Sequence, residues 1–165
     1  MDWTILNEIV DFRELRIEPA TIHDLGKLAR IMIAAYENLS YQYLKKNLGP
    51  PGYNALKGHM DWLACDDYRK ILYKQKIVGG FILQRYNNSL FLGMIFLAIP
   101  HQHQGIGTYV MNYLENNPNY DKIVLNTPEW ATHNQKFFEK IGYMKFKTEY
   151  DSNLGFNLYF YQKKI

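Results

Sequence analysis

The stretch FLGMIFLAIPHQHQGIGTYVMNYLENNP, residues 91–118, decides the fold of this chain. Its first nine residues are apolar, as is typical of a strand that is buried on both faces. Gly105 and Gly107 then precede an amphipathic segment that stops before Pro118. The apolar face of that segment is made by Val110, Met111 and Leu114. The stretch therefore predicts a buried strand, a glycine loop and a helix in succession.

The segments around this stretch extend the pattern in both directions. Thr21 and Asp24 have the spacing of a capping box at the start of a helix. The remaining predicted elements are a strand at 13–19, helices at 21–39 and 55–67, strands at 68–74, 76–86 and 122–127, a helix at 132–143, and two strands from 144 onward. This order implies an α+β fold with a mixed, mostly antiparallel sheet and one parallel step across the glycine-loop helix.

Composition limits the classes of protein to which the chain can belong. It has 165 residues, of which 47% are hydrophobic and 21% charged, with a formal net charge of +3 and one cysteine. These values predict a single globular domain over 1–165, with no disulfide framework and no nucleic-acid-binding cluster of basic residues. No apolar run approaches the roughly 18 residues of a membrane span, and no secretory leader is recognisable. We expect a cytoplasmic protein without a membrane partner.

The glycine loop has the features of an anion site. With side chains absent at Gly105 and Gly107, backbone N–H groups over 104–108 can point at one place, where the helix dipole also favours a phosphate. A dinucleotide fingerprint is disfavoured because Val110 replaces its third glycine, and a P-loop is disfavoured because its lysine is missing. A loop whose glycines serve only the backbone geometry stays open as an alternative.

Two motifs give the chain a family resemblance. QHQGIG, residues 102–107, resembles the pyrophosphate-binding signature Q/R-x-x-G-x-G/A of the GNAT superfamily of N-acetyltransferases. NQKFFEKIGY, residues 134–143, resembles the second signature of that family, an Asn followed by F-Y-x-K-x-G-F. The predicted element order over 13–163 is also similar to the GNAT fold. The resemblance implies a mostly antiparallel mixed sheet of six to seven strands flanked by about four helices, with 1–12 as an N-terminal extension.

The resemblance also implies acetyl-CoA as a co-substrate, bound in a cleft where the strands at 91–99 and 122–127 splay apart. Backbone groups at Leu97 and Ile99 would pair with the pantetheine amides, as an added strand does. Asn134 would bind the pantetheine arm, and the glycine loop would bind the pyrophosphate. The residues expected at the cofactor are Leu97, Ile99, Gln102, Gln104, Gly105, Ile106, Gly107, Thr108, Asn134 and Phe138.

Catalytic groups do not follow from the resemblance. The strand at 91–99 has no titratable side chain where many relatives carry Glu or His, and Phe138 stands where the family usually has a tyrosine that is proposed to protonate the thiolate. Glu129 and Tyr143 are the remaining candidates. Their competing interpretations are a solvated loop carboxylate and a packed aromatic ring. The catalytic residues therefore stay unknown at this stage.

Several other residues receive structural interpretations. His101 and His103 lack a Cys, Asp or Glu at ligand spacing, so we interpret them as surface histidines and expect no metal. Cys65 is interpreted as a packing thiol. Gly93, inside the apolar strand, indicates either a β-bulge or a packing position, and we interpret it as packing.

The acceptor side is predicted from an aromatic segment near the GPPGY turn at 49–53. Tyr36, Tyr53 and Asp61 are expected to bind an amine by cation–π contact and ion pairing, although aromatic residues at helical spacing also build cores. The predicted reaction is acetyl transfer to the primary amine of a small molecule or peptide. The alternative is a non-catalytic acyl-CoA-binding or sensing module, and the choice between a monomer and a homodimer stays open.

Overall fold

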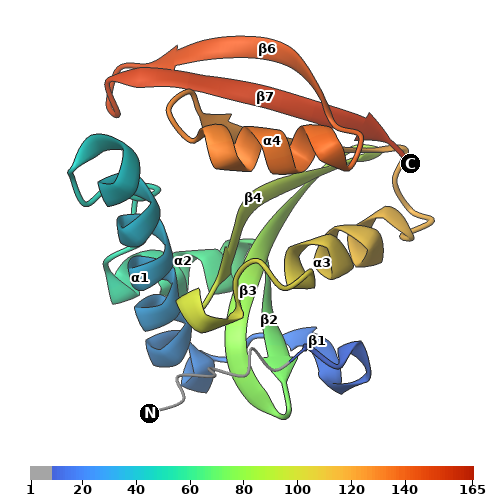
Figure 1. Cartoon of the computed structure of the whole chain (residues 1–165). Coiled ribbons are helices and arrows are strands. Elements are labelled where there is room, and N and C mark those ends of the chain that lie inside the picture. The colour runs from blue at the N-terminus through green and yellow to red at the C-terminus, as the bar shows by residue number, and fades with distance from the viewer. Residues whose placement is uncertain (1–8) are drawn as a thin grey trace, which may run out of the picture.

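A seven-stranded mixed sheet runs through the molecule in the order β1-β2-β3-β4-β5-β7-β6 (Figure 1). The computed structural model describes residues 9–165. Neighbouring strands are antiparallel except for β4 and β5, which are parallel and are joined across α3. The strands are β1 Leu15–Pro19, β2 Asp67–Tyr73, β3 Lys76–Tyr86, β4 Ser89–Leu97, β5 Lys122–Pro128, β6 Met144–Asp151 and β7 Phe156–Lys164. The predicted α+β class and the single parallel step are confirmed.

Helices cover the sheet close to the positions that the sequence predicts, although α1 continues five residues beyond the predicted end at 39. They are α1 Leu25–Leu44, α2 Leu56–Cys65, α3 Ile106–Glu115 and α4 Thr132–Lys140, with 3₁₀ turns η1 Phe12–Glu14, η2 Ile22–Asp24 and η3 Ile99–His101. The predicted polar start of the first helix is present, because the N–H and the hydroxyl of Thr21 both donate to Asp24 Oδ2, at 2.8 and 2.9 Å. The first turn after Thr21 is η2, so α1 itself begins at Leu25.

The hydrophobic core has two parts, and the alternation of β3 separates them. Phe81 packs with α3 and α4 in the larger cluster, whereas Ile82 packs with α1 in the smaller one. β4 also contributes to both clusters, through Leu92 in the first and Phe96 in the second. The prediction that this strand is buried on both faces is thus confirmed.

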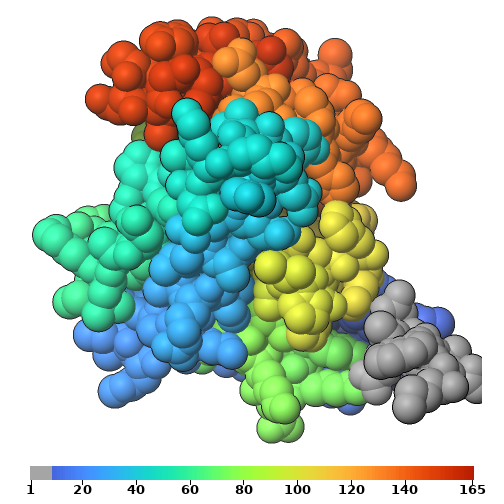
Figure 2. Space-filling model, turned by 60° about the vertical axis from the view of Figure 1, so that its left-hand side comes forward, coloured from blue at the N-terminus to red at the C-terminus, as the bar shows by residue number. Residues whose placement is uncertain are grey.

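The end of α1 reaches across to the start of α4. Figure 2 shows the cyan region around the end of α1 lying against the orange region of α4. The N–H of His133 donates to the Tyr43 hydroxyl at 3.1 Å, and Thr132 Oγ1 lies 3.1 Å from the same oxygen. This contact links the two halves of the sheet on the side of α1. Among residues 9–165, no helix is long and apolar enough to cross a bilayer.

Candidate functional site

The two parallel strands of the sheet separate halfway along their length. β4 and β5 pair from Ser89 with Lys122 to Leu92 with Leu125. The following part of β4 remains paired with β3 on its other side, as far as Leu97. The edge of β4 over 93–97 therefore faces β5 without a ladder, and it can accept an extended, amide-bearing ligand.

A β-bulge at Gly93 marks the place where the strands separate. Ile82 of β3 pairs with Met94 and Leu83 pairs with Leu92, so Gly93 is the extra residue. A Cβ added at Gly93 would lie 3.6 Å from its nearest neighbour, the carbonyl oxygen of Ile82, which is an ordinary contact. The interpretation of Gly93 as a packing glycine is therefore wrong. A bulge bends its strand and increases the local twist, which turns the rest of β4 away from β5.

The loop between β4 and α3 is held by its own side chains. The Nε2 groups of Gln102 and Gln104 donate to the carbonyl oxygens of Leu97 and Pro100, each at 2.9 Å. Gln102 thus bonds the strand end itself. Ile99 lies in η3, beyond the end of β4, and its carbonyl accepts the Gln102 N–H at 3.2 Å. The strand edge available to a ligand therefore ends at Leu97, two residues earlier than the sequence suggests.

Backbone donors converge at the start of α3. Gly105 is the N-cap with a left-handed φ of 85°, and the N–H of Tyr109 makes the first helical bond, to the Gly105 carbonyl at 3.0 Å. The N–H groups of Ile106, Gly107 and Thr108 precede that bond and point out of the helix end. Three such donors and the positive end of the helix dipole together favour an anion at this position.

The two sequence motifs meet in space. A Cβ on Gly107 would lie 3.3 Å from Cζ of Phe137 in α4, so the glycine lets the two helices approach. Asn134, one turn earlier on α4, directs its Nδ2 to Thr127 Oγ1 at 3.4 Å. Thr127 lies on β5 beyond the part that pairs with β4. The loop and Asn134 therefore flank the region where β4 and β5 separate.

Phe138 and Tyr143 belong to the larger core rather than to this region. Phe138 is 6% exposed and its ring packs against those of Tyr143 and Tyr161. Burial, followed by the nearby Glu115 carboxylate, raises the pKa of Tyr143. Glu115 is paired with Lys163 at 2.8 Å, and Lys163 stands opposite Ile123, in the half of β5 that is still paired with β4. The structure does not bring the Tyr143 hydroxyl to the loop.

Glu129 is engaged in closing the end of the β5–β7 pair. Its carboxylate accepts the backbone N–H of Asn157 at 3.1 Å and the Asn157 side-chain amide at 2.8 Å. These hydrogen bonds lower the pKa of Glu129, the side-chain bond contributing most. A carboxylate stabilised in this way is a poor base, because its proton affinity is reduced. No local pattern points to Asn157, which lies 28 residues away.

The predicted acceptor residues occupy three different environments. Tyr36 interacts with the backbone of Ile95, on the separated part of β4, and burial raises its pKa. Tyr53 is buried and donates its hydroxyl to Glu37 Oε1 at 2.9 Å. Asp61 is exposed and pairs with Lys57 at 2.6 Å, one turn away on α2. Tyr36 is thus the predicted acceptor residue with an interaction on the separated segment of β4.

A buried histidine that no sequence pattern singled out joins the elements around Tyr53. His59 is fully buried, with Nε2 2.9 Å from the Tyr53 carbonyl and Nδ1 3.0 Å from the Tyr68 hydroxyl. Since a carbonyl only accepts, Nε2 carries the hydrogen and Nδ1 accepts from Tyr68 in the neutral ring. Burial lowers the pKa of His59 below 6.5. The neutral imidazole thereby joins α2, the turn before it and β2.

The His59 environment predicts acid sensitivity. Because the folded state lowers the pKa of His59, the unfolded chain binds more protons as the pH falls below 6.5. The stability from the neutral ring is complete above that pH and is lost as the pH drops through the folded-state value. The groups that face the ring are Tyr68, Tyr53 and Trp62. We expect the unfolding free energy to fall more steeply between pH 7 and 5 in the parent than in His59→Gln.

Urea unfolding at several pH values measures this difference. His23→Gln is the matched control, because His23 is exposed at the start of the first helical segment. Its pH profile should follow that of the parent. Equal slopes in the parent and in His59→Gln would contradict the prediction.

Two further features lie away from the loop. A polar cavity of about 580 Å³ is lined by residues of β2, β3 and the end of α2, including Cys65, Arg69 and Arg85, and shares no residue with the loop. Cys65 is exposed, so its interpretation as a packing thiol is wrong. Over residues 9–165, no group of three or more His, Cys, Asp or Glu is arranged to hold a metal ion.

Comparison with known proteins identifies what this arrangement resembles. Residues 60–145 match the family model of the acetyltransferase (GNAT) domain. The probable N-acetyltransferase san of Drosophila melanogaster is 28% identical over an alignment of 103 residues, and the match covers 57% of this chain and 55% of that protein. The match thus spans about half the length of that relative.

Solved structures share the fold across almost the whole chain. The PaiA N-acetyltransferase of Thermoplasma acidophilum, in complex with coenzyme A, is 15% identical with a TM-score of 0.70, and the match covers 92% of this chain and 99% of that one. The ribosomal-protein-S18-alanine N-acetyltransferase of Escherichia coli is 14% identical with a TM-score of 0.71, and the match covers 92% and 94% of the two chains.

Proposed function

Because the chain belongs to the GNAT acetyltransferase family, we propose that it transfers an acetyl group from acetyl-CoA to a primary amine of a small molecule or peptide. The amine would attack the thioester directly while both substrates are bound. The observation that carries this proposal is the separation of β4 from β5 beside the helix-capping loop at Gly105. That arrangement offers an amide-pairing edge and an anion site to one extended ligand.

The residues present fit such a donor. The N–H groups of Ile106, Gly107 and Thr108 would hold the diphosphate, while the free edge of β4 up to Leu97 and the amide of Asn134 would hold the arm. Gly105 leaves room for the Phe12 ring, and Gly107 leaves room for Phe137 of α4. Acetyl-CoA supplies an acetyl thioester whose thiolate, with a thiol pKa of about 8.5, leaves without strong assistance.

The chain's own task is to position the amine and to stabilise charge. A backbone N–H on β4 just after the bulge would donate to the thioester carbonyl oxygen as negative charge develops there. An alkylamine has a pKa near 10.4 in water, so it must lose a proton before it attacks. Tyr36 of α1 interacts with the backbone of Ile95 on this strand, and we place its hydroxyl beside the amine. Glu129 and Tyr143 are not assigned roles in catalysis.

A second candidate function is a non-catalytic acyl-CoA-binding module. Phe138 favours it, because this ring lies in the core and carries no hydroxyl that could protonate the thiolate. Thiolate departure does not depend strictly on such an acid, since general acid catalysis typically contributes roughly 10²- to 10⁴-fold in rate. We therefore rank transfer above sensing.

Thiol release distinguishes the two functions. The protein is incubated with acetyl-CoA and a panel of amines, including polyamines and short peptides with a free N-terminus, and free thiol is followed over time. Amine-dependent release supports transfer, and we expect Tyr36→Phe to lower kcat/KM for the amine about tenfold at an unchanged acetyl-CoA Kd. Tight binding of acetyl-CoA without release for any amine would support the sensing module. No binding by the folded protein would overturn both functions.

A further inference from the structure

The segment just before β1 lies on the glycine loop. Phe12, in η1, stacks on Tyr109 of α3 with ring centroids 6.0 Å apart and planes inclined by 15°. A Cβ added at Gly105 would meet Cζ of Phe12 at 3.1 Å. Within the described chain, and apart from the glycine's own neighbours, only Phe12 atoms lie within 4 Å of that position. Phe12 therefore forms the contact on this side of the helix cap.

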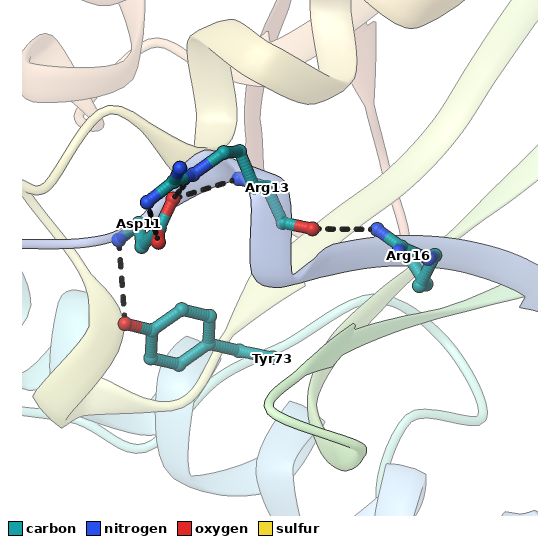
Figure 3. Close-up of polar contacts among 4 residues, drawn as sticks. All are labelled: Asp11, Arg13, Arg16 and Tyr73. Carbon is teal, nitrogen blue, oxygen red and sulfur yellow. Dashed lines mark hydrogen bonds and ion pairs between the residues drawn. The ribbon is translucent and has the colours of Figure 1, made fainter.

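Contacts of the residues next to Phe12 hold the segment in this place. Val10 is 6% exposed and belongs to the larger core. The N–H of Asp11 donates to the Tyr73 hydroxyl at 3.3 Å, and the Arg13 guanidinium donates to the Asp11 carboxylate at 2.9 and 2.8 Å (Figure 3). Arg16 in turn donates to the Arg13 carbonyl at 2.7 Å. The segment at 10–14 is thus an ordered part of the domain, although the sequence suggested an extension over 1–12.

The same segment also contacts the beginning of the loop indirectly. Tyr73, whose hydroxyl accepts the Asp11 N–H, packs its ring edge to face against His101, with the ring centroids 5.9 Å apart. Between His101 and α3 the backbone takes left-handed φ values at His103 (60°) and Gly105 (85°). Left-handed backbone is costly for any residue with a side chain, so neighbouring contacts must hold it.

We propose that Phe12 is a positioning residue for the diphosphate of the acyl donor. By resting on Gly105 and Tyr109 it keeps the loop in the conformation that aims the three N–H groups at an anion. The inference rests on the proposed function, because it concerns the same site. It assigns to the segment before β1 a part in donor binding that neither sequence motif contains. Preorganisation of this kind lowers the ordering cost of binding and leaves the chemical step unchanged.

Phe12→Ala tests the proposal. We expect the Kd and the KM for acetyl-CoA to rise about tenfold at an unchanged kcat, because the loop must be ordered by the ligand. With S-acetylpantetheine, which lacks the diphosphate, parent and variant should have the same kcat/KM. Ile22→Ala is the matched control, because it removes an exposed apolar side chain of η2. It should leave the kinetic constants for both donors unchanged.

The outcomes separate this inference from the proposed function. If the parent turns over and Phe12→Ala has the same Kd for acetyl-CoA, the inference alone is overturned. Equal losses of kcat/KM in Phe12→Ala with acetyl-CoA and with S-acetylpantetheine would also overturn it. A parent that binds no acetyl-CoA would overturn the proposed function and the inference with it. Where turnover of the short donor is too slow to follow, the ratio of acetyl-CoA Kd values decides. Tyr73→Phe, which keeps the ring at His101 but loses the Asp11 bond, should show a smaller rise in Kd.

Discussion

Gly105→Glu is expected to weaken acetyl-CoA binding at least a hundredfold. Gly105 caps α3 with φ at 85°, where a residue with a Cβ is strained by about 1–2 kcal/mol. The new Cβ would also press on Phe12 at 3.1 Å. Most of the loss should come from the carboxylate, which would compete with the diphosphate for the N–H donors and repel it. A hundredfold change in Kd corresponds to about 2.8 kcal/mol, which these effects together can supply.

Calorimetric titration with acetyl-CoA measures this loss, and two variants separate its causes. Gly105→Lys carries the same backbone strain with the opposite charge, so its affinity should lie between those of the parent and Gly105→Glu. Gly155→Glu repeats the substitution at a glycine with φ at 81° and open space around it, in the turn between β6 and β7. It should bind like the parent. Tight binding by a folded Gly105→Glu would show that the loop is only a turn.

Most of the fold could be predicted from the sequence, because the patterns that indicate helices, strands and turns are local. Alternation, capping and turn residues predict elements one at a time, and the order of these elements leaves few sheet topologies. The glycine loop could likewise be found, since its geometry depends on residues within a few positions of Gly105. The role of Asn134 stays a prediction from a second local motif. These predictions needed no knowledge of partners from distant parts of the chain.

The remaining features depend on partners that are far apart in the sequence. Glu129 has an ordinary loop context until Asn157 of β7 donates to both of its oxygens. His59 is a helical residue like any other until Tyr68 and the Tyr53 carbonyl enclose it. Phe12 lies more than ninety positions before the loop that it contacts. Such contacts arise from strand register and helix docking, which local patterns do not specify.

Glycines in the central strands show the same limit at the scale of one methyl group. Gly79 and Gly93 both lie in apolar runs, and no local pattern shows that their roles differ. In the structure, a Cβ at Gly93 makes ordinary contacts at 3.6 Å and beyond, whereas one at Gly79 would lie 2.3 Å from the Phe96 carbonyl oxygen and 3.1 Å from Cα of Leu97. Gly93 is the extra residue of a bulge, whereas Gly79 permits the close approach of two strands.

Gly79→Ala is therefore expected to destabilise the protein by about 3 kcal/mol, toward the upper end of what overpacking usually costs. Backbone atoms of β4 obstruct the new methyl group, so no side-chain rotation can relieve the clash. Gly93→Ala, the matched control in the paired strand, should change the unfolding free energy by less than about 1 kcal/mol. Urea unfolding of both variants gives the comparison, and equal effects would contradict the register of β3 and β4. Because Gly79 stands opposite Leu97, the displaced end of β4 should also bind acetyl-CoA more weakly.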